Sequence, residues 1–473
     1  MVLSKADSSI TEKKFREIWQ YPEIAGQTLI AENGTKVKIV YPGRPNDGQG
    51  ADFRDAVIMT GRELQTGDVE FHLRSGDWRG HHHHLDPVYN RVILHIVKHH
   101  NSGKGTILQN GKEIPIVVID NSPGVFTFRN GTPSNDRSRA GMNCLNVAGY
   151  AGDKYIFKYL DRAGKNRFLQ KAERFSSEIS GVTPGESLYR GIMEALGYSG
   201  NKDAFRELAR KAPLDLLEIK KDSGMRDDTY LFYLQLILFS RAGFLAAENM
   251  ERLCSAGLDR ELVKRMIGAV KVTDRSDTMS PGSWRLFRIR PCNSPFRRLA
   301  AMSYLLLKYR RKGLLKGMLD LVDSVSNAAK PRDMEKGLVV STDSISYLGK
   351  NRAAEIIVNV LLPFSLAYGE YNDEPELSEK ALALYTDYPG LEMNSLIRHM
   401  TGQLGFDKSA VNRAIRQQGL IHIYKNLCTR GRCYECELSK FKTGRDVQRK
   451  SVNLPGFKPE ETAGSDHGGV IGA

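Results

Sequence analysis

The chain lacks any apolar run of the roughly 18 residues that a membrane-spanning helix needs, although hydrophobic residues make up 41% of its 473 residues. Its first residues, MVLSKADSSITEKKF, lack the charged-then-apolar layout of a secretory signal. Six cysteines are too few, in a chain this long, for a disulfide framework. We therefore expect a cytoplasmic protein with no membrane partner.

Nucleotide-binding motifs are also missing. The sequence contains neither the phosphate-binding GxxxxGK[ST] loop nor the Rossmann glycine fingerprint, so ATP-driven or NAD-driven chemistry is unsupported. Acidic side chains are in deficit, because 69 Lys and Arg face 55 Asp and Glu and give a net charge of +14. This excess favours polyanionic partners, nucleic acid first, although many basic proteins have no such partner.

The hydrophobic pattern changes about a third of the way along the chain. Residues 10–20 predict a helix with Phe15, Ile18 and Trp19 on one face, and alternation or apolar runs predict strands at 35–44, 51–59, 67–74, 91–97 and 114–120. Helical spacing dominates from about residue 183. We therefore predict an α+β protein with an N-terminal mixed-sheet domain at 1–173, an all-α domain at 183–441 and a disordered tail at 442–473.

One predicted strand carries an acidic face. In GDVEFHLR, residues 67–74, Glu70, His72 and Arg74 point to one side, and Asp52 opens the preceding strand. If the two strands are neighbours, Asp52 and Glu70 meet and could hold Mg²⁺, with His72 positioning or deprotonating water and Arg74 neutralising a phosphate. The alternative is a strand with one solvated polar face.

Eight of the eleven histidines fall between residues 67 and 100. His72 with His81 or His84 and a carboxylate could bind zinc instead of Mg²⁺. Four consecutive histidines, residues 81–84, cannot all be ligands of one ion, so at least two of them are expected on the surface. His95 lies in an apolar strand and is expected to be a buried, hydrogen-bonded core residue.

The N-terminal order of helix, strands and acidic residues resembles the PD-(D/E)XK nuclease superfamily over about residues 35–120. Asp52 matches the first aspartate of that motif and Glu70 the second acid, whereas His72 stands where a lysine is expected and Ala51 where a proline is expected. The resemblance implies a restriction-endonuclease-like fold and Mg²⁺-dependent cleavage of DNA or RNA. Because histidine lacks a fixed charge near pH 7, a non-catalytic nucleic-acid-binding or scaffold protein is the alternative. A zinc-dependent hydrolase built on the histidines is a third.

Longer motifs resemble an uncharacterised bacterial family known only as a domain of unknown function, from about Phe15 to Phe441. They include YPGRPNDGQGADF, GDVEFHLRSGDW, YRGIMEALGYSGNKDAF, RIRPCNSPFRRLAAM and CTRGRCYEC. The resemblance implies a shared fold and no particular activity.

Three cysteines, Cys428, Cys433 and Cys436, lie close together near the end of the helical part. They could bind Zn²⁺ or an iron–sulfur cluster. The stretch is similar to the cysteine loop of helix-hairpin-helix DNA glycosylases, which binds such a cluster, but Lys440 and Phe441 stand where the fourth cysteine belongs. His422 could supply a fourth ligand; the alternative is three reduced thiols that pack the loop.

A basic stretch at residues 285–316 holds ten Lys or Arg and no acid, with aromatic residues interleaved. Arginines can pair with phosphates, which predicts nucleic-acid contacts. The alternative is an amphipathic helix whose arginines bind helix C-termini or acidic neighbours. The candidate contacts are Arg285, Arg288, Arg290, Arg297, Arg298, Arg310 and Arg311.

Overall fold

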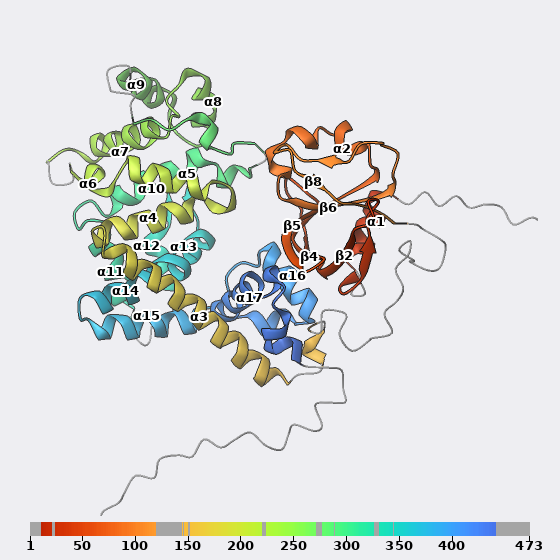
Figure 1. The fold of residues 1–473 in the computed structure, drawn as a ribbon. Helices are drawn as coiled ribbons and strands as arrows, with labels where there is room; N and C mark the ends of the chain where they lie inside the picture. The colour runs from red at the N-terminus through yellow and green to blue at the C-terminus, as the bar shows by residue number, and fades with distance from the viewer. Residues whose placement is uncertain are drawn as a thin grey trace, which may run out of the picture.

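The computed structural model describes residues 11–20, 24–119, 144, 146–149, 152–219, 224–270, 277–287, 289–325, 331–343 and 345–440. Within them the protein is mixed α/β, with an N-terminal mixed sheet followed by a mostly helical part. Figure 1 shows the two parts side by side, with the C-terminal helices next to the sheet. The predicted tail at 442–473 lies outside the described residues.

A seven-stranded sheet, ordered β1-β2-β4-β5-β6-β9 with β3 beside β4, forms the N-terminal part. The neighbours up to β5 are antiparallel, whereas β5–β6 and β6–β9 are parallel. The five predicted strands are therefore confirmed as β2, β4, β5, β6 and β9. The bounds are β1 Thr28–Ile30, β2 Lys36–Tyr41, β3 Arg44–Pro45, β4 Phe53–Thr60, β5 Glu63–Arg74, β6 Val92–His99 and β9 Ile116–Val118, with a hairpin of β7 Thr106–Ile107 and β8 Glu113–Ile114.

Helix α1 (Glu12–Trp19) covers one face of the sheet. The Thr11 hydroxyl caps its first turn, and its buried side chains Phe15 and Trp19 each lie 5.5 Å from the ring of Phe71 on β5. The predicted apolar face of this helix is thus confirmed. Because α1 occupies the Phe71 side, the alternate residues of β5 face the opposite side of the sheet, where the candidate site lies.

The helical part follows as a stack around one large apolar core. A short hairpin of β10 Val340–Ser341 and β11 Ser346–Leu348 interrupts it. A π-helical turn, Ile357–Leu361, joins two of its core helices. The helices are α3 Asp153–Ile179, α4 Pro184–Leu196, α5 Tyr198–Lys211, α6 Leu214–Glu218, α7 Asp227–Arg241, α8 Met250–Ser255, α9 Arg260–Val270, α10 Pro295–Lys308, α11 Leu314–Asp323, α12 Glu335–Leu338, α13 Lys350–Ile356, α14 Leu362–Tyr371, α15 Pro375–Asp387, α16 Ser395–Leu404 and α17 Ala414–Asn426.

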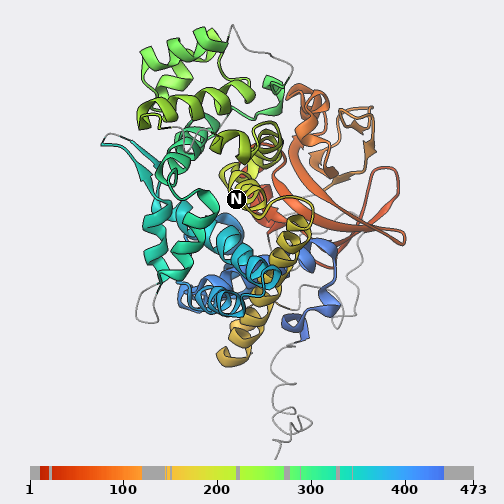
Figure 2. The same cartoon turned by 90° about the vertical axis from the view of Figure 1, so that its left-hand side faces the viewer.

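The end of the helical part packs back onto the sheet. Tyr41 and Val57 of the sheet share a buried core with α3, α16 and α17, and the Tyr424 hydroxyl donates to Asp55 on β4 at 2.9 Å. Figure 2, turned by 90°, shows the blue C-terminal helices lying against α3 and below the sheet. The predicted boundary at residue 173 falls inside α3, which joins these layers.

One stretch, Lys350–Tyr371, is long and apolar enough to cross a membrane by length and composition. Of its most apolar window, 78% is buried within the protein. Burial of this extent is what a core helix shows, because its apolar side chains already contact protein.

Helices α3 and α17 are in close contact at two glycines, one on each helix. A Cβ atom at Gly164 would lie 2.0 Å from the carbonyl oxygen of Ile415, and one at Gly419 would lie 2.2 Å from that of Leu160. A backbone atom cannot move aside as a flexible side chain can. Gly419→Ala is therefore expected to destabilise the protein by about 2–4 kcal/mol, measured by urea unfolding.

Gly402→Ala is the matched control. Gly402 is exposed on α16 with nothing within 4 Å of an added Cβ, so alanine there is expected to leave stability unchanged or raise it by about 1 kcal/mol. Equal unfolding midpoints for the two variants would contradict the close approach of α3 and α17.

Candidate functional site

The polar face of β5 is buried. Asp68 and Glu70 are each 6% exposed and His72 is 2% exposed, while Val69 and Phe71 fill the core on the other face. The predicted alternation is confirmed, but the alternative of a solvated polar face is wrong. Burial of ionisable groups costs free energy unless they are paired or neutral, so this face is a candidate site.

The loop after β5 covers this face. Helix α2 (Asp77–Gly80) buries Trp78, whose indole N–H donates to the Ile107 carbonyl at 3.0 Å. His82 then adopts a left-handed backbone with φ 63°, and its side chain is exposed. The neighbouring His83 stacks on Tyr89 with ring centroids 3.9 Å apart. The turn at His82 thus separates an outward histidine from the inward His83.

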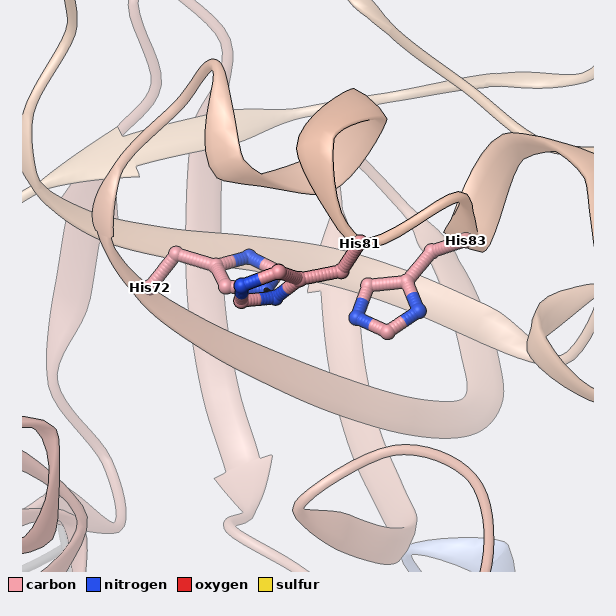
Figure 3. A group of neighbouring side chains, drawn as sticks. All are labelled: His72, His81 and His83. Carbon is pink, nitrogen blue, oxygen red and sulfur yellow. Dashed lines mark hydrogen bonds between the residues drawn. The ribbon is translucent and has the colours of Figure 1, made fainter.

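His72, His81 and His83 form one group. Each offers a ring nitrogen that lies within 4.8 Å of those of the other two. Figure 3 shows the three rings converging, one from β5 and two from the loop. His72 Nε2 lies 3.2 Å from His81 Nδ1. His81 is exposed and His83 half-buried, so the group is open to solvent on one side.

Glu70 lies beside this group. Its Oε1 is 3.4 Å from His83 Nε2 and 3.7 Å from His72 Nε2. Its Oε2 accepts the backbone N–H of Asp52 at 2.9 Å. The carboxylate is therefore held by one oxygen and presents the other to the histidines.

A hydrogen-bonded chain orients His72. His72 Nδ1 lies 2.9 Å from His95 Nε2, and His95 Nδ1 lies 2.7 Å from Thr106 Oγ1. If each Nδ1 carries the proton, His72 donates to His95, His95 donates to the hydroxyl of Thr106, and Nε2 of His72 keeps its lone pair for a ligand. A second hydrogen bond of this kind is what orients metal-binding histidines in proteins. His95 is fully buried, which confirms its predicted core position.

Burial sets the protonation of the group. It lowers the pKa of His72 to about 2, of His95 to about 3 and of His83 to about 4, and the neighbouring imidazoles add to each shift. Burial, followed by the nearby Asp52 carboxylate, raises the pKa of Glu70 to about 9. Without a metal, His72, His83 and His95 are therefore neutral at pH 7, which is the form of imidazole that binds metals, and Glu70 keeps its proton.

The distances suit a first-row transition ion. Zinc binds imidazole nitrogen at about 2.0–2.1 Å, so two ligands of one tetrahedral ion lie about 3.4 Å apart. The distances of 3.2 Å from His72 Nε2 to His81 Nδ1 and of 3.4 Å from His83 Nε2 to Glu70 Oε1 match this ligand-to-ligand separation. Nitrogen donors favour zinc, copper, iron or nickel over Mg²⁺.

Asp52 faces other partners. Its Oδ1 accepts from Arg16 of α1 at 2.6 Å, and its Oδ2 accepts the backbone N–H of Phe71 at 3.2 Å. Both oxygens thus have donors, although burial still raises the pKa of Asp52 against the opposing effect of Arg16. A Mg²⁺ ion shared by Asp52 and Glu70 stays a prediction, and it would have to compete with the Arg16 ion pair.

Two other predicted residues lie outside the group of three. His84 is half-buried, and its ring centroid lies 6.3 Å from that of His82. His83, and not the predicted His84, joins His72 and His81 in the group. Arg74 is exposed at the end of β5 on the face of Glu70 and His72. No local pattern singles out His83 within the run of four histidines, because only the backbone turn at His82 separates it from its neighbours.

The arginines of the basic stretch do not act as one set. Arg298 is buried and donates to the Tyr347 carbonyl and to Asn293, and burial lowers its pKa to about 10. Arg310 is buried, pairs with Asp227 at 2.8 Å and lies over the ring of Tyr230. Both therefore stabilise the helical part. Of the others, Arg285, Arg290 and Arg311 are exposed, Arg297 is half-buried and Arg288 lies outside the described residues.

Cys428 and Cys436 are buried and Cys433 is half-buried, in short 3₁₀ turns after α17. The suggested fourth ligand, His422, instead has its Nδ1 at 3.1 Å from the side-chain nitrogen of Asn426 and borders a small pocket beside α3. Metal binding by the three cysteines stays a prediction.

The three-histidine group and its buried carboxylate define a candidate transition-metal centre on a mixed sheet. The chain belongs to a family described as a protein of unknown function (DUF2851), whose model matches residues 12–395. This confirms the family resemblance over the matched residues, whereas the motif CTRGRCYEC lies beyond them. No curated protein and no solved structure matches the chain. The activity must therefore be argued from the site itself.

Proposed function

We propose that the protein is a metal-dependent hydrolase that binds a zinc-like ion through His72, His81 and His83 and uses Glu70 as general base. The observation that carries the proposal is the convergence of three histidine side chains beside the buried carboxyl group of Glu70. Catalytic zinc commonly takes three protein ligands and leaves one position for water. A bound ion would lower the pKa of that water to near 7 and, by its positive charge, would also lower the pKa of Glu70, so that the ionised carboxylate could take the proton.

The proposed substrate is a phosphodiester of DNA or RNA. The net charge of +14 favours a polyanion, and Arg74 is exposed on the side of the sheet that carries Glu70 and His72. As the finer description of the fold, we propose a restriction-endonuclease-like domain, because α1 precedes a mixed sheet in which Asp52 stands just before β4 and Glu70 lies on the neighbouring β5. A cytoplasmic location remains part of the proposal.

The test uses the full chain without an affinity tag, because added histidines would bind metal themselves. Metal content is measured by mass spectrometry, and hydrolysis of bis(p-nitrophenyl) phosphate and of labelled DNA and RNA is followed with Zn²⁺, Mn²⁺ or Mg²⁺. His72→Ala is expected to weaken Zn²⁺ binding by at least about 100-fold and to abolish hydrolysis, because it removes a ligand.

His82→Asn is the matched control. It changes an adjacent exposed histidine, and asparagine tolerates the left-handed backbone found there. Metal and hydrolysis retained by His72→Ala would contradict the proposal. Salt-sensitive nucleic-acid binding without cleavage by any metal form would instead favour the non-catalytic alternative, and cleavage with Mg²⁺ alone would favour the Asp52–Glu70 site.

A further inference from the structure

Four of the six cysteines gather at one place, far from the histidines in the sequence. Cys144, Cys428 and Cys436 share a buried core and are 8%, 7% and 5% exposed. Cys433 is half-buried in the same loop, where its carbonyl accepts the backbone N–H of Cys436 at 3.1 Å. All of them are free thiols. The fourth member therefore comes from residue 144, not from the helix that carries His422.

The backbone holds both segments in place. Gly431 adopts a left-handed φ of 64° and presses against the sheet, since a Cβ there would lie 3.2 Å from Val57 and 3.3 Å from Val40. On the other side, the N–H of Asn146 donates to the Gln403 carbonyl at 3.1 Å. The Gln403 side chain donates in turn to Cys144 Sγ at 3.4 Å. Contacts with Gln403 near the end of α16 thus hold the segment that carries Cys144 in place.

Two of the sulfurs accept hydrogen bonds. The Tyr159 hydroxyl donates to Cys436 Sγ at 3.8 Å, and the Gln403 side chain donates to Cys144 Sγ. A neutral thiol is only a weak acceptor. Hydrogen bonds to sulfur are one means by which proteins tune metal-bound thiolates.

Spacing indicates the kind of centre. The three loop cysteines follow the order C-x₄-C-x₂-C with a remote fourth, which is a known iron–sulfur ligand spacing.

We propose that Cys144, Cys428, Cys433 and Cys436 bind an iron–sulfur cluster. Binding replaces four S–H bonds with four S–Fe bonds, and the four protons pass to solvent. The cluster would link residue 144 to the loop after α17, which itself lies against the sheet at Gly431. It is independent of the histidine site.

The test is iron and acid-labile sulfide in the untagged full chain, purified without oxygen and also reconstituted with ferrous iron and sulfide. The expected result is equal iron and sulfide, two or four of each per chain, with a Mössbauer spectrum of tetrahedral thiolate-bound iron. Cys144→Ser is expected to lose most of the iron, whereas the matched controls Cys254→Ser and Cys292→Ser keep it.

Zinc bound by the four thiols in place of iron, or no metal at all, would overturn the proposal. So would full iron content in Cys144→Ser. The wild-type Mössbauer spectrum decides the identity of the centre even if Cys144→Ser fails to fold. His72→Ala is expected to keep the cluster, so that failure of the histidine-site hypothesis and failure of this one are told apart.

Discussion

Glu70→Gln is expected to lower kcat for phosphodiester hydrolysis by about 10²–10⁴-fold while the variant still binds its metal ion. Glutamine keeps the shape of the side chain and an oxygen that can accept the N–H of Asp52, but it cannot take a proton from water. The three histidine ligands remain, so metal affinity is expected to change by no more than about tenfold. The measurement is kcat at saturating metal, paired with a competition titration of metal affinity.

Glu63→Gln is the matched control for this substitution. Glu63 lies on the same strand, at its exposed end, so the charge change is the same but the site is untouched. An unchanged kcat in Glu70→Gln would show that Glu70 is not the general base. A loss of activity that added metal fully restores would assign Glu70 to metal binding alone.

Acid is expected to destabilise the metal-free protein strongly. Burial lowers the pKa of His72, His83, His95 and His399 below that of an exposed histidine, to values between about 2 and 4. The unfolded chain then binds more protons than the folded chain as pH falls below 6.5. Stability supplied by these neutral histidines is therefore present above pH 6.5 and is lost as pH falls, by up to about 1.4 kcal/mol per pH unit for each.

Glu70 acts in the opposite direction. Its pKa is raised to about 9, so the folded protein keeps a proton that the unfolded chain releases above pH 4.5, and this contribution falls as pH rises. Burial also raises the pKa of Asp52 and Asp68, which act in the same direction as Glu70. The four histidines still outweigh these carboxyls, and we expect the free energy of unfolding to fall by several kcal/mol between pH 7 and pH 5. Urea unfolding with EDTA at pH 7, 6 and 5 measures this. A stability that is flat or rises toward pH 5 would show that the buried histidines are not held neutral.

The sequence predicted those helices and strands whose apolar side chains lie on one face. The alternation in β2 and β5 and the buried face of α1 are local signals, and each produced the correct element. The long helix α3 was not predicted, because it packs against α4, α14 and α17 and so has no single apolar stripe. The β7–β8 hairpin was also missed, since its strands have only two residues each.

The site was predicted in part. Glu70 and His72 share a strand face by simple alternation, so they could be placed together in advance. Arg16 could not, because its pairing with Asp52 joins a helix to a strand 36 residues away. The choice of His83 in place of His84 depends on one left-handed residue, His82, and four identical letters carry no signal for it. Cys144 and Cys428 share one buried core through the packing of α16 and α17, and the sequence carries no local signal for that packing.

The most direct measurement for the central claim is anomalous diffraction at the zinc edge from crystals of the untagged protein grown with Zn²⁺. We expect one strong peak about 2.0–2.1 Å from His72 Nε2 and from ring nitrogens of His81 and His83, with Glu70 beside it. The absence of a peak there, with the three histidine side chains in unchanged positions, would contradict the proposed metal site.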